Sequence, residues 1–135
     1  MKSVLFVCVH NAGRSQMAEA FVNSIAAQSG VEVVGLSAGT ITGSAVNPVA
    51  VEVMGEVGIS MVGQTPKQLT SEMVRSADRV ITMGCGVDAE ACPANTIFSD
   101  DWGLDDPIGQ SIDRVREIRD QIRARVEALL GELSA

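Results

Sequence analysis

The sequence of 135 residues contains no tyrosine, and it has only one tryptophan, three phenylalanines and one histidine. So few aromatic rings leave no platform on which nucleic-acid bases stack. Positive charge is also scarce, because 10 lysines and arginines stand against 17 acidic residues and give a net charge of −7. This balance argues against binding to a phosphate backbone. Any affinity for a small anion must therefore come from local hydrogen-bond donors.

Long apolar runs are absent too. No run approaches the length needed to span a membrane. Only Lys2 precedes the first short apolar run, which does not resemble a secretory leader. We therefore expect a cytoplasmic protein and a monomer with no membrane partner. In that setting three cysteines favour redox or catalytic use over structural disulfides.

Strand and helix signals alternate along the chain, which predicts an α/β fold with a four-stranded parallel sheet and helices on both faces. The length and the 46% hydrophobic content fit a single domain, residues 1–135. Ligands of such sheets bind beyond the carboxyl ends of the strands. The expected strands are 3–7, 31–37, 78–83 and 95–98, and the expected helices are 14–27, 48–57, 70–76 and one that Ser111 opens.

The segment from Cys8 to Ser15 has the strongest chemical pattern. Cys8 ends an apolar run, and five residues separate it from Arg14, which opens the first expected helix. A helix N-terminus favours negative charge, so the same field binds an oxyanion and favours the nucleophilic thiolate. The Arg14 guanidinium can grip two oxygens of such an anion. Each residue taken alone has a purely structural interpretation. A cysteine at the end of a strand is often a small buried hydrophobe, and an arginine in the first turn of a helix is often a solvated side chain.

Cys85 and Cys92 form a second pattern, with six residues between them and Pro93 directly after. A zinc site built from the three cysteines and His10 is one interpretation. It is weak because His10 lies in a loop suited to anions and no close Cys-x-x-Cys pair exists. We therefore expect no metal. Burial of both cysteines as hydrophobes is the other structural interpretation.

The Cys8–Ser15 segment resembles the anion loop of low-molecular-weight protein tyrosine phosphatases and of the arsenate reductases that share their fold. Further segments resemble the reductase branch, and the resemblance extends from Lys2 to about Leu130. These segments are Ser15–Ala20, Leu36–Gly39, Thr82–Cys85, Ala91–Pro93 and Asp105–Pro107.

The resemblance implies arsenate reduction, with Cys8 as the nucleophile that attacks arsenic. Ser15 is expected to donate a hydrogen bond to the Cys8 thiolate. Asp106, held in an extended conformation by Pro107, is the expected general acid. The Asn11 side chain is expected to hold the loop in shape by hydrogen bonds to the backbone, and both Asn11 and Gly13 tolerate a left-handed conformation. The oxyanion is expected to bind the loop N–H groups and guanidinium of Val9, His10, Asn11, Ala12, Gly13 and Arg14, while the His10 side chain points away.

The resemblance also implies a disulfide relay with no bound cofactor. Cys85 attacks the Cys8–arsenic adduct, arsenite leaves, and Cys92 then attacks Cys85 to free Cys8. Thioredoxin is the implied reductant of the resulting Cys85–Cys92 disulfide.

Some members of the family bind a monovalent cation beside the loop, through positions that match Asn11, Glu19 and Ser37 and an acidic residue. Lys67 occupies the position of that acidic residue. Its ammonium is expected to pair with Glu19 in place of the cation, so we expect no requirement for potassium.

Three other functions remain open. A tyrosine phosphatase would use the same loop, although Ile108 and Gly109 replace the aromatic residues that usually follow its Asp-Pro. A reductase that uses mycothiol or glutathione would need only Cys8. A redox-sensing or anion-binding module would need neither Asp106 nor the second and third cysteines.

Overall fold

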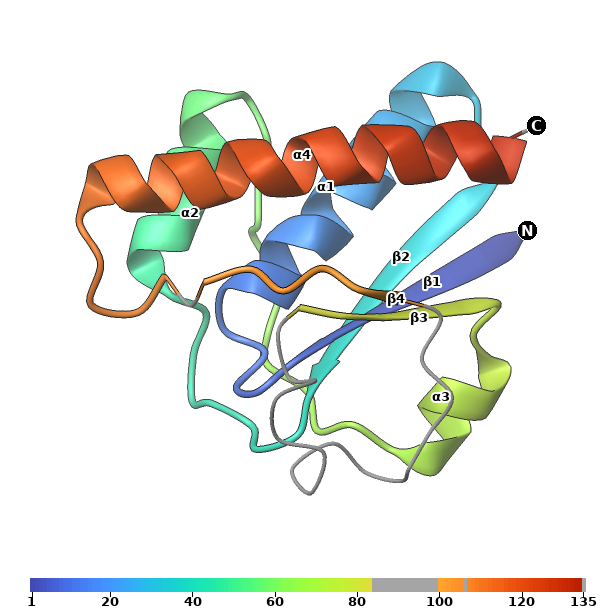
Figure 1. Cartoon of the computed structure of the whole chain (residues 1–135), viewed down its shortest axis with the longest axis horizontal. Helices are drawn as coiled ribbons and strands as arrows, with labels where there is room; N and C mark the ends of the chain where they lie inside the picture. The colour runs from blue at the N-terminus through green and yellow to red at the C-terminus, as the bar shows by residue number, and fades with distance from the viewer. Residues whose placement is uncertain (84–99, 106, 135) are drawn as a thin grey trace.

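The computed structural model describes residues 1–83, 100–105 and 107–134 of the chain. Its centre is a parallel sheet in the order β2-β1-β3-β4 (Figure 1). Strand β1 (Lys2–Cys8) pairs along its whole length with β2 (Val33–Gly39) on one side, and β3 (Arg79–Thr82) pairs with it on the other. The chain is therefore an α/β fold, as the alternating pattern predicted.

The fourth strand differs from the expectation. The segment 95–98 lies outside the described residues, and the strand that pairs with β3 is β4 (Asp100–Asp101). Among the described residues, three strands of at least four residues make the body of the sheet, and this two-residue strand lies at its edge. The extended run ends soon after β4 because Gly103 has a φ of 56°, which turns the backbone out of the strand direction.

Helices cover both faces of the sheet. Helices α1 (Arg14–Ser29), α2 (Pro48–Glu56) and α4 (Ile112–Ser134) lie on one face, and α3 (Ser71–Ser76) lies on the other (Figure 1). Successive side chains of strand β1 accordingly point to alternate faces of the sheet. Val4, Phe6 and Cys8 belong to the larger apolar cluster with α1 and α4, whereas Leu5 and Val7 belong to the smaller cluster beside α3. Cys8 is thus placed on the face that α1 covers.

The helix ends follow local chemistry. The Asn47 side chain accepts a hydrogen bond from the Val49 N–H, and Thr70 accepts one from the Met73 N–H. Gly30 ends α1 with a φ of 71°. None of the described helices is long and apolar enough to cross a membrane.

An ion-pair cluster joins α2 to α4. Glu56 contacts Arg116 at 2.7 Å and Arg119 at 2.9 Å. The hydrogen bond from Arg116 is the main cause that lowers the pKa of Glu56 from its ordinary value of 4.5. A carboxyl whose pKa is lower in the folded state stabilises the fold above its unfolded pKa, and this stabilisation is lost as the pH falls through the folded pKa.

We therefore expect Glu56→Gln to lower the melting temperature slightly at pH 7, because the pair with Arg116 is solvent-exposed and Glu56 itself is only half-buried. The difference from the parent should shrink as the pH falls below 4.5. Thermal unfolding followed by circular dichroism from pH 3 to 8 measures it, with Glu52→Gln on the exposed face of the same helix as control. A difference that stays constant over this pH range contradicts the assignment.

Candidate active site

The loop that joins β1 to α1 lies at the carboxyl end of the sheet. We call residues 8–15 the anion loop. The Met83 N–H, just after β3, donates to the Val7 carbonyl at 2.8 Å, so the ends of β1 and β3 are adjacent. The chain runs from β1 to β2 on one side and later returns to β3 on the other, so this is the point where strand order reverses. Ligands of open α/β sheets bind at this point.

The segment after β2 holds the carbonyls of the anion loop. The N–H groups of Thr40, Ile41, Gly43 and Asn47 donate to the carbonyls of residues 8, 9, 10 and 12, at 2.7–3.2 Å. In a trans peptide the next N–H points opposite to the carbonyl. The described residues contain no cis peptide. The N–H groups of residues 9, 10, 11 and 13 therefore point away from the 40–47 segment, which is the arrangement that an oxyanion needs.

Two glycines permit close packing around this loop. A Cβ on Gly39 would lie 2.7 Å from the Val9 carbonyl oxygen, so only glycine lets the end of β2 approach the loop. A Cβ on Gly13 would lie 2.8 Å from Cγ of Pro107. Gly13 has a φ of −133° and does not adopt the left-handed conformation that it tolerates, so the glycine is required by this close approach instead. Asn11 does adopt the left-handed conformation that its position tolerates, with a φ of 53°.

Cys8 lies in a buried hydrogen-bond network. Its Sγ is 2.8 Å from Oγ of Ser15, and the Asn11 Nδ2 donates to the same hydroxyl at 2.7 Å. The Asn11 Oδ1 accepts the main-chain N–H of Lys67 at 2.8 Å, which fixes the amide orientation. Asn11 and Ser15 are fully buried and Cys8 nearly so. This geometry lets the Ser15 hydroxyl donate to sulfur, and it brings together three of the residues that the sequence singled out.

Arg14 is buried beside the loop, at 8% exposure. Its Nη1 donates to the carbonyls of Met83 and Leu104, each at 2.8 Å. These bonds tie the ends of two chain segments to the anion loop. The sequence predicted only the contact with an anion, because Met83 and Leu104 are distant along the chain.

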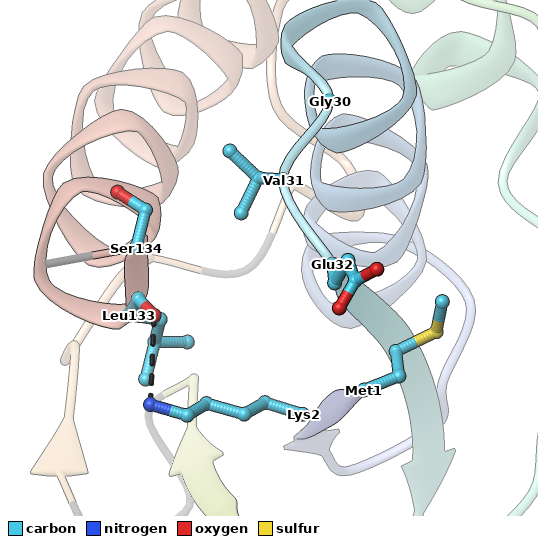
Figure 2. A pocket seen from close by; sticks show the side chains of 7 residues that line it. All are labelled: Met1, Lys2, Gly30, Val31, Glu32, Leu133 and Ser134. Carbon is cyan, nitrogen blue, oxygen red and sulfur yellow. Dashed lines mark hydrogen bonds between the residues drawn. The ribbon is translucent and has the colours of Figure 1, made fainter.

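A small hollow opens next to Cys8, lined by residues 8, 10, 12, 13, 14 and 108. His10 is one of these residues, and its ring Nδ1 lies 3.0 Å from the Ile41 carbonyl oxygen. That His10 has no catalytic role stays a prediction. A larger hollow of about 390 Å³ lies at the opposite end of β1, between Lys2 and Leu133 (Figure 2). It contains no residue of the anion loop.

Three predicted catalytic residues, Cys85, Cys92 and Asp106, lie outside the described residues. Their neighbour Pro107 is described, and it packs against Gly13 of the anion loop. Two further residues of the site were not predicted. Gln16 and Gln64 are hydrogen-bonded to each other behind the loop. Gln16 lies in a segment that resembles the reductases, but no local pattern distinguishes a buried glutamine from a solvated one.

The ammonium of Lys67 lies 3.7 Å from Oε1 of Glu19, which confirms the expected pairing. Ser37 donates to the same carboxylate oxygen at 2.9 Å, and Lys67 also donates to the Thr65 carbonyl. The positive charge beside Glu19, where some members of the family bind a monovalent cation, is thus supplied by Lys67. Within the described part of the chain, no three His, Cys, Asp or Glu residues are grouped so as to hold a metal ion.

We therefore predict that potassium does not stimulate the enzyme. Turnover in potassium chloride should equal turnover in sodium or choline chloride at the same ionic strength, because the Glu19 carboxylate already has a cation beside it. Steady-state rates over a titration of each salt measure this. A several-fold gain that is specific to potassium would refute it.

Comparison with known proteins places these features in a family. Residues 3–135 match the family model described as low molecular weight phosphotyrosine protein phosphatase. A putative arsenate reductase of Halobacterium salinarum is 43% identical over 134 residues, covering 96% of this chain and 91% of that protein. A glutaredoxin arsenate reductase of Synechocystis sp. is 37% identical, covering 99% of this chain and all of that protein.

A solved structure shares the fold as well. The thioredoxin-dependent arsenate reductase Cg_ArsC1' of Corynebacterium glutamicum superposes with a TM-score of 0.78 at 36% identity. The match covers 98% of this chain and 62% of that one. The family match extends over almost the whole length, and the relatives agree with it. The chain therefore belongs to the low molecular weight phosphotyrosine protein phosphatase family.

Proposed function

We propose that this protein is an arsenate reductase that acts in arsenic detoxification. The observation that carries the proposal is the Cys8 sulfur, 2.8 Å from the Ser15 hydroxyl, in a loop whose carbonyls are turned toward the 40–47 segment. A tetrahedral oxyanion fits such a loop, and the thiolate is placed to attack its central atom. The names of the relatives support arsenate as that oxyanion.

The first step forms a bond between Cys8 Sγ and arsenic. The N–H groups of residues 9–13 and the Arg14 guanidinium bind the oxygens, and Asp106 gives a proton to the oxygen that leaves as water. Cys85 then attacks Cys8 Sγ. The sulfur–arsenic bond breaks, and its electron pair stays on arsenic, which is thereby reduced to arsenite. A Cys8–Cys85 disulfide remains, and the two thiols have supplied both electrons.

Regeneration requires an external dithiol. Cys92 attacks Cys85 and frees Cys8, and the Cys85–Cys92 disulfide is then reduced. We propose thioredoxin as the donor, in line with the three cysteines and with the thioredoxin-dependent relative. The name of the Synechocystis relative makes glutaredoxin the alternative donor. We further propose that residues 1–135 act as one domain, as a cytoplasmic monomer with no bound cofactor.

Phosphatase activity on phosphotyrosine is the second candidate function. The family description favours it, and the same anion loop would serve it. It would give Cys85 and Cys92 no role, and Ile108 borders the hollow where a phosphatase of this fold usually has an aromatic wall.

The decisive experiment measures NADPH oxidation with arsenate, thioredoxin and thioredoxin reductase. Sustained turnover that depends on arsenate supports the proposal. A parallel assay with glutathione, glutaredoxin and glutathione reductase identifies the donor. Absence of turnover in both assays, together with hydrolysis of p-nitrophenyl phosphate, would replace the proposal by the phosphatase.

A further inference from the structure

The anion loop is connected to the 61–69 segment by a continuous chain of hydrogen bonds between uncharged side chains. Gln64 Nε2 donates to Gln16 Oε1 at 2.7 Å, and Gln16 Nε2 donates to Asn11 Oδ1 at 2.9 Å. Asn11 Nδ2 donates to Ser15 Oγ at 2.7 Å, and this hydroxyl lies 2.8 Å from Cys8 Sγ. The chain thus runs from the half-buried Gln64 to the nucleophile.

Main-chain groups fix the direction of each amide in this chain. The Lys67 N–H can only donate, so the Asn11 atom that faces it must be oxygen. The Gln16 atom that faces the carbonyl oxygens of Asn11 and Thr65, at 3.1 and 2.9 Å, must be nitrogen. The Gln64 atom that lies 3.1 Å from the Gln16 carbonyl oxygen must likewise be nitrogen. No amide can be reversed without facing two acceptors or two donors.

The orientation of the Asn11 amide bears on the hydrogen bond between the Ser15 hydroxyl and the Cys8 sulfur. Asn11 occupies one acceptor position of the Ser15 oxygen, and the hydroxyl proton of Ser15 can be donated to Cys8. A Cys8 thiolate can only accept this hydrogen bond, and a hydrogen bond to the charged form favours that form. Gln16, Asn11 and Ser15 are fully buried, where successive hydrogen bonds polarise one another more strongly than in water.

We propose that Gln16 and Gln64 are positioning residues for the nucleophile, holding Asn11 and Ser15 in the orientation that presents a proton donor to Cys8. The inference deepens the arsenate reductase proposal and rests on it for its biological meaning. Gln16 orients the amide of Asn11, and Gln64 in turn orients Gln16. Neither residue touches the oxyanion.

The test measures alkylation of Cys8 by iodoacetamide between pH 5 and pH 10. Cys85→Ser and Cys92→Ser form the background, so that Cys8 is the only thiol. The alkylation rate follows the thiolate fraction. Gln16→Met should lower the rate at pH 6 about fivefold and Gln64→Met about twofold, with rates at pH 10 equal to the background, because a lost donor shifts the protonation balance alone.

The matched control is Gln68→Met. Gln68 lies in the same segment, and its side chain bonds to Thr40 and Thr42. Its pH profile should match the background. A rate that falls equally at every pH, or profiles of Gln16→Met and Gln64→Met that match Gln68→Met, would overturn the proposal. Circular dichroism checks folding, and if Gln16→Met fails to fold, Gln64→Met decides. The assay contains no arsenate, so its outcome is independent of the proposed reaction.

Discussion

Replacement of Cys92 by serine should convert the enzyme from a catalyst into a reagent that makes about one arsenite per chain. The reason lies in the order of the thiol exchanges. In the proposed relay Cys8 and Cys85 together supply both electrons to arsenic, so the first turnover needs no third thiol. Without Cys92, the enzyme stops as a Cys8–Cys85 disulfide, and Cys8 is buried within the anion loop.

Rapid-quench measurement of arsenite, followed by steady-state turnover with thioredoxin, tests this result. We expect a stoichiometric burst and then a steady-state rate lowered on the order of a hundredfold, since a buried disulfide reacts slowly with an external dithiol. Cys8→Ser is the control and should give no burst. An unchanged steady-state rate in Cys92→Ser would instead support a route in which a small thiol attacks the arsenic adduct directly.

Most secondary structure of the described residues could be predicted because its causes are local. The caps at Asn47 and Thr70 and the left-handed Gly30 each depend on a few neighbouring residues. The position of Cys8 at a strand end and the left-handed Asn11 follow from local chemistry in the same way.

The features that could not be predicted depend on contacts between distant parts of the chain. Gln64 reaches Gln16 across 48 positions, and Arg14 reaches Leu104 across 90. Residue 13 must be glycine because Pro107, which is distant along the sequence, approaches it closely. Sequence patterns report burial and turns, but they do not report which distant carbonyl a buried donor meets. The fold therefore could be predicted more fully than the support around the nucleophile.

Arg14→Lys is the second change with a large expected effect. The arginine has two tasks, because its Nη1 holds the carbonyls of Met83 and Leu104 while the guanidinium is proposed to bind the oxyanion. Lysine offers a single ammonium and no planar fork, so it cannot perform both. We expect kcat/KM for arsenate to fall on the order of a hundred- to a thousandfold, as when one preorganised donor to the transition state is removed.

Arg119→Lys separates the loss of anion binding from the general cost of shortening a buried arginine. Arg119 is exposed to a similar degree, and its Nη1 also donates to a main-chain carbonyl, that of Val53 at 3.0 Å. It lies between α2 and α4, away from the anion loop. Both variants should lose thermal stability, but only Arg14→Lys should lose kcat/KM and weaken inhibition by inorganic phosphate. Equal kinetic losses in both variants would show that Arg14 acts by supporting the fold, and binding of the oxyanion would then rest on the N–H groups of the loop.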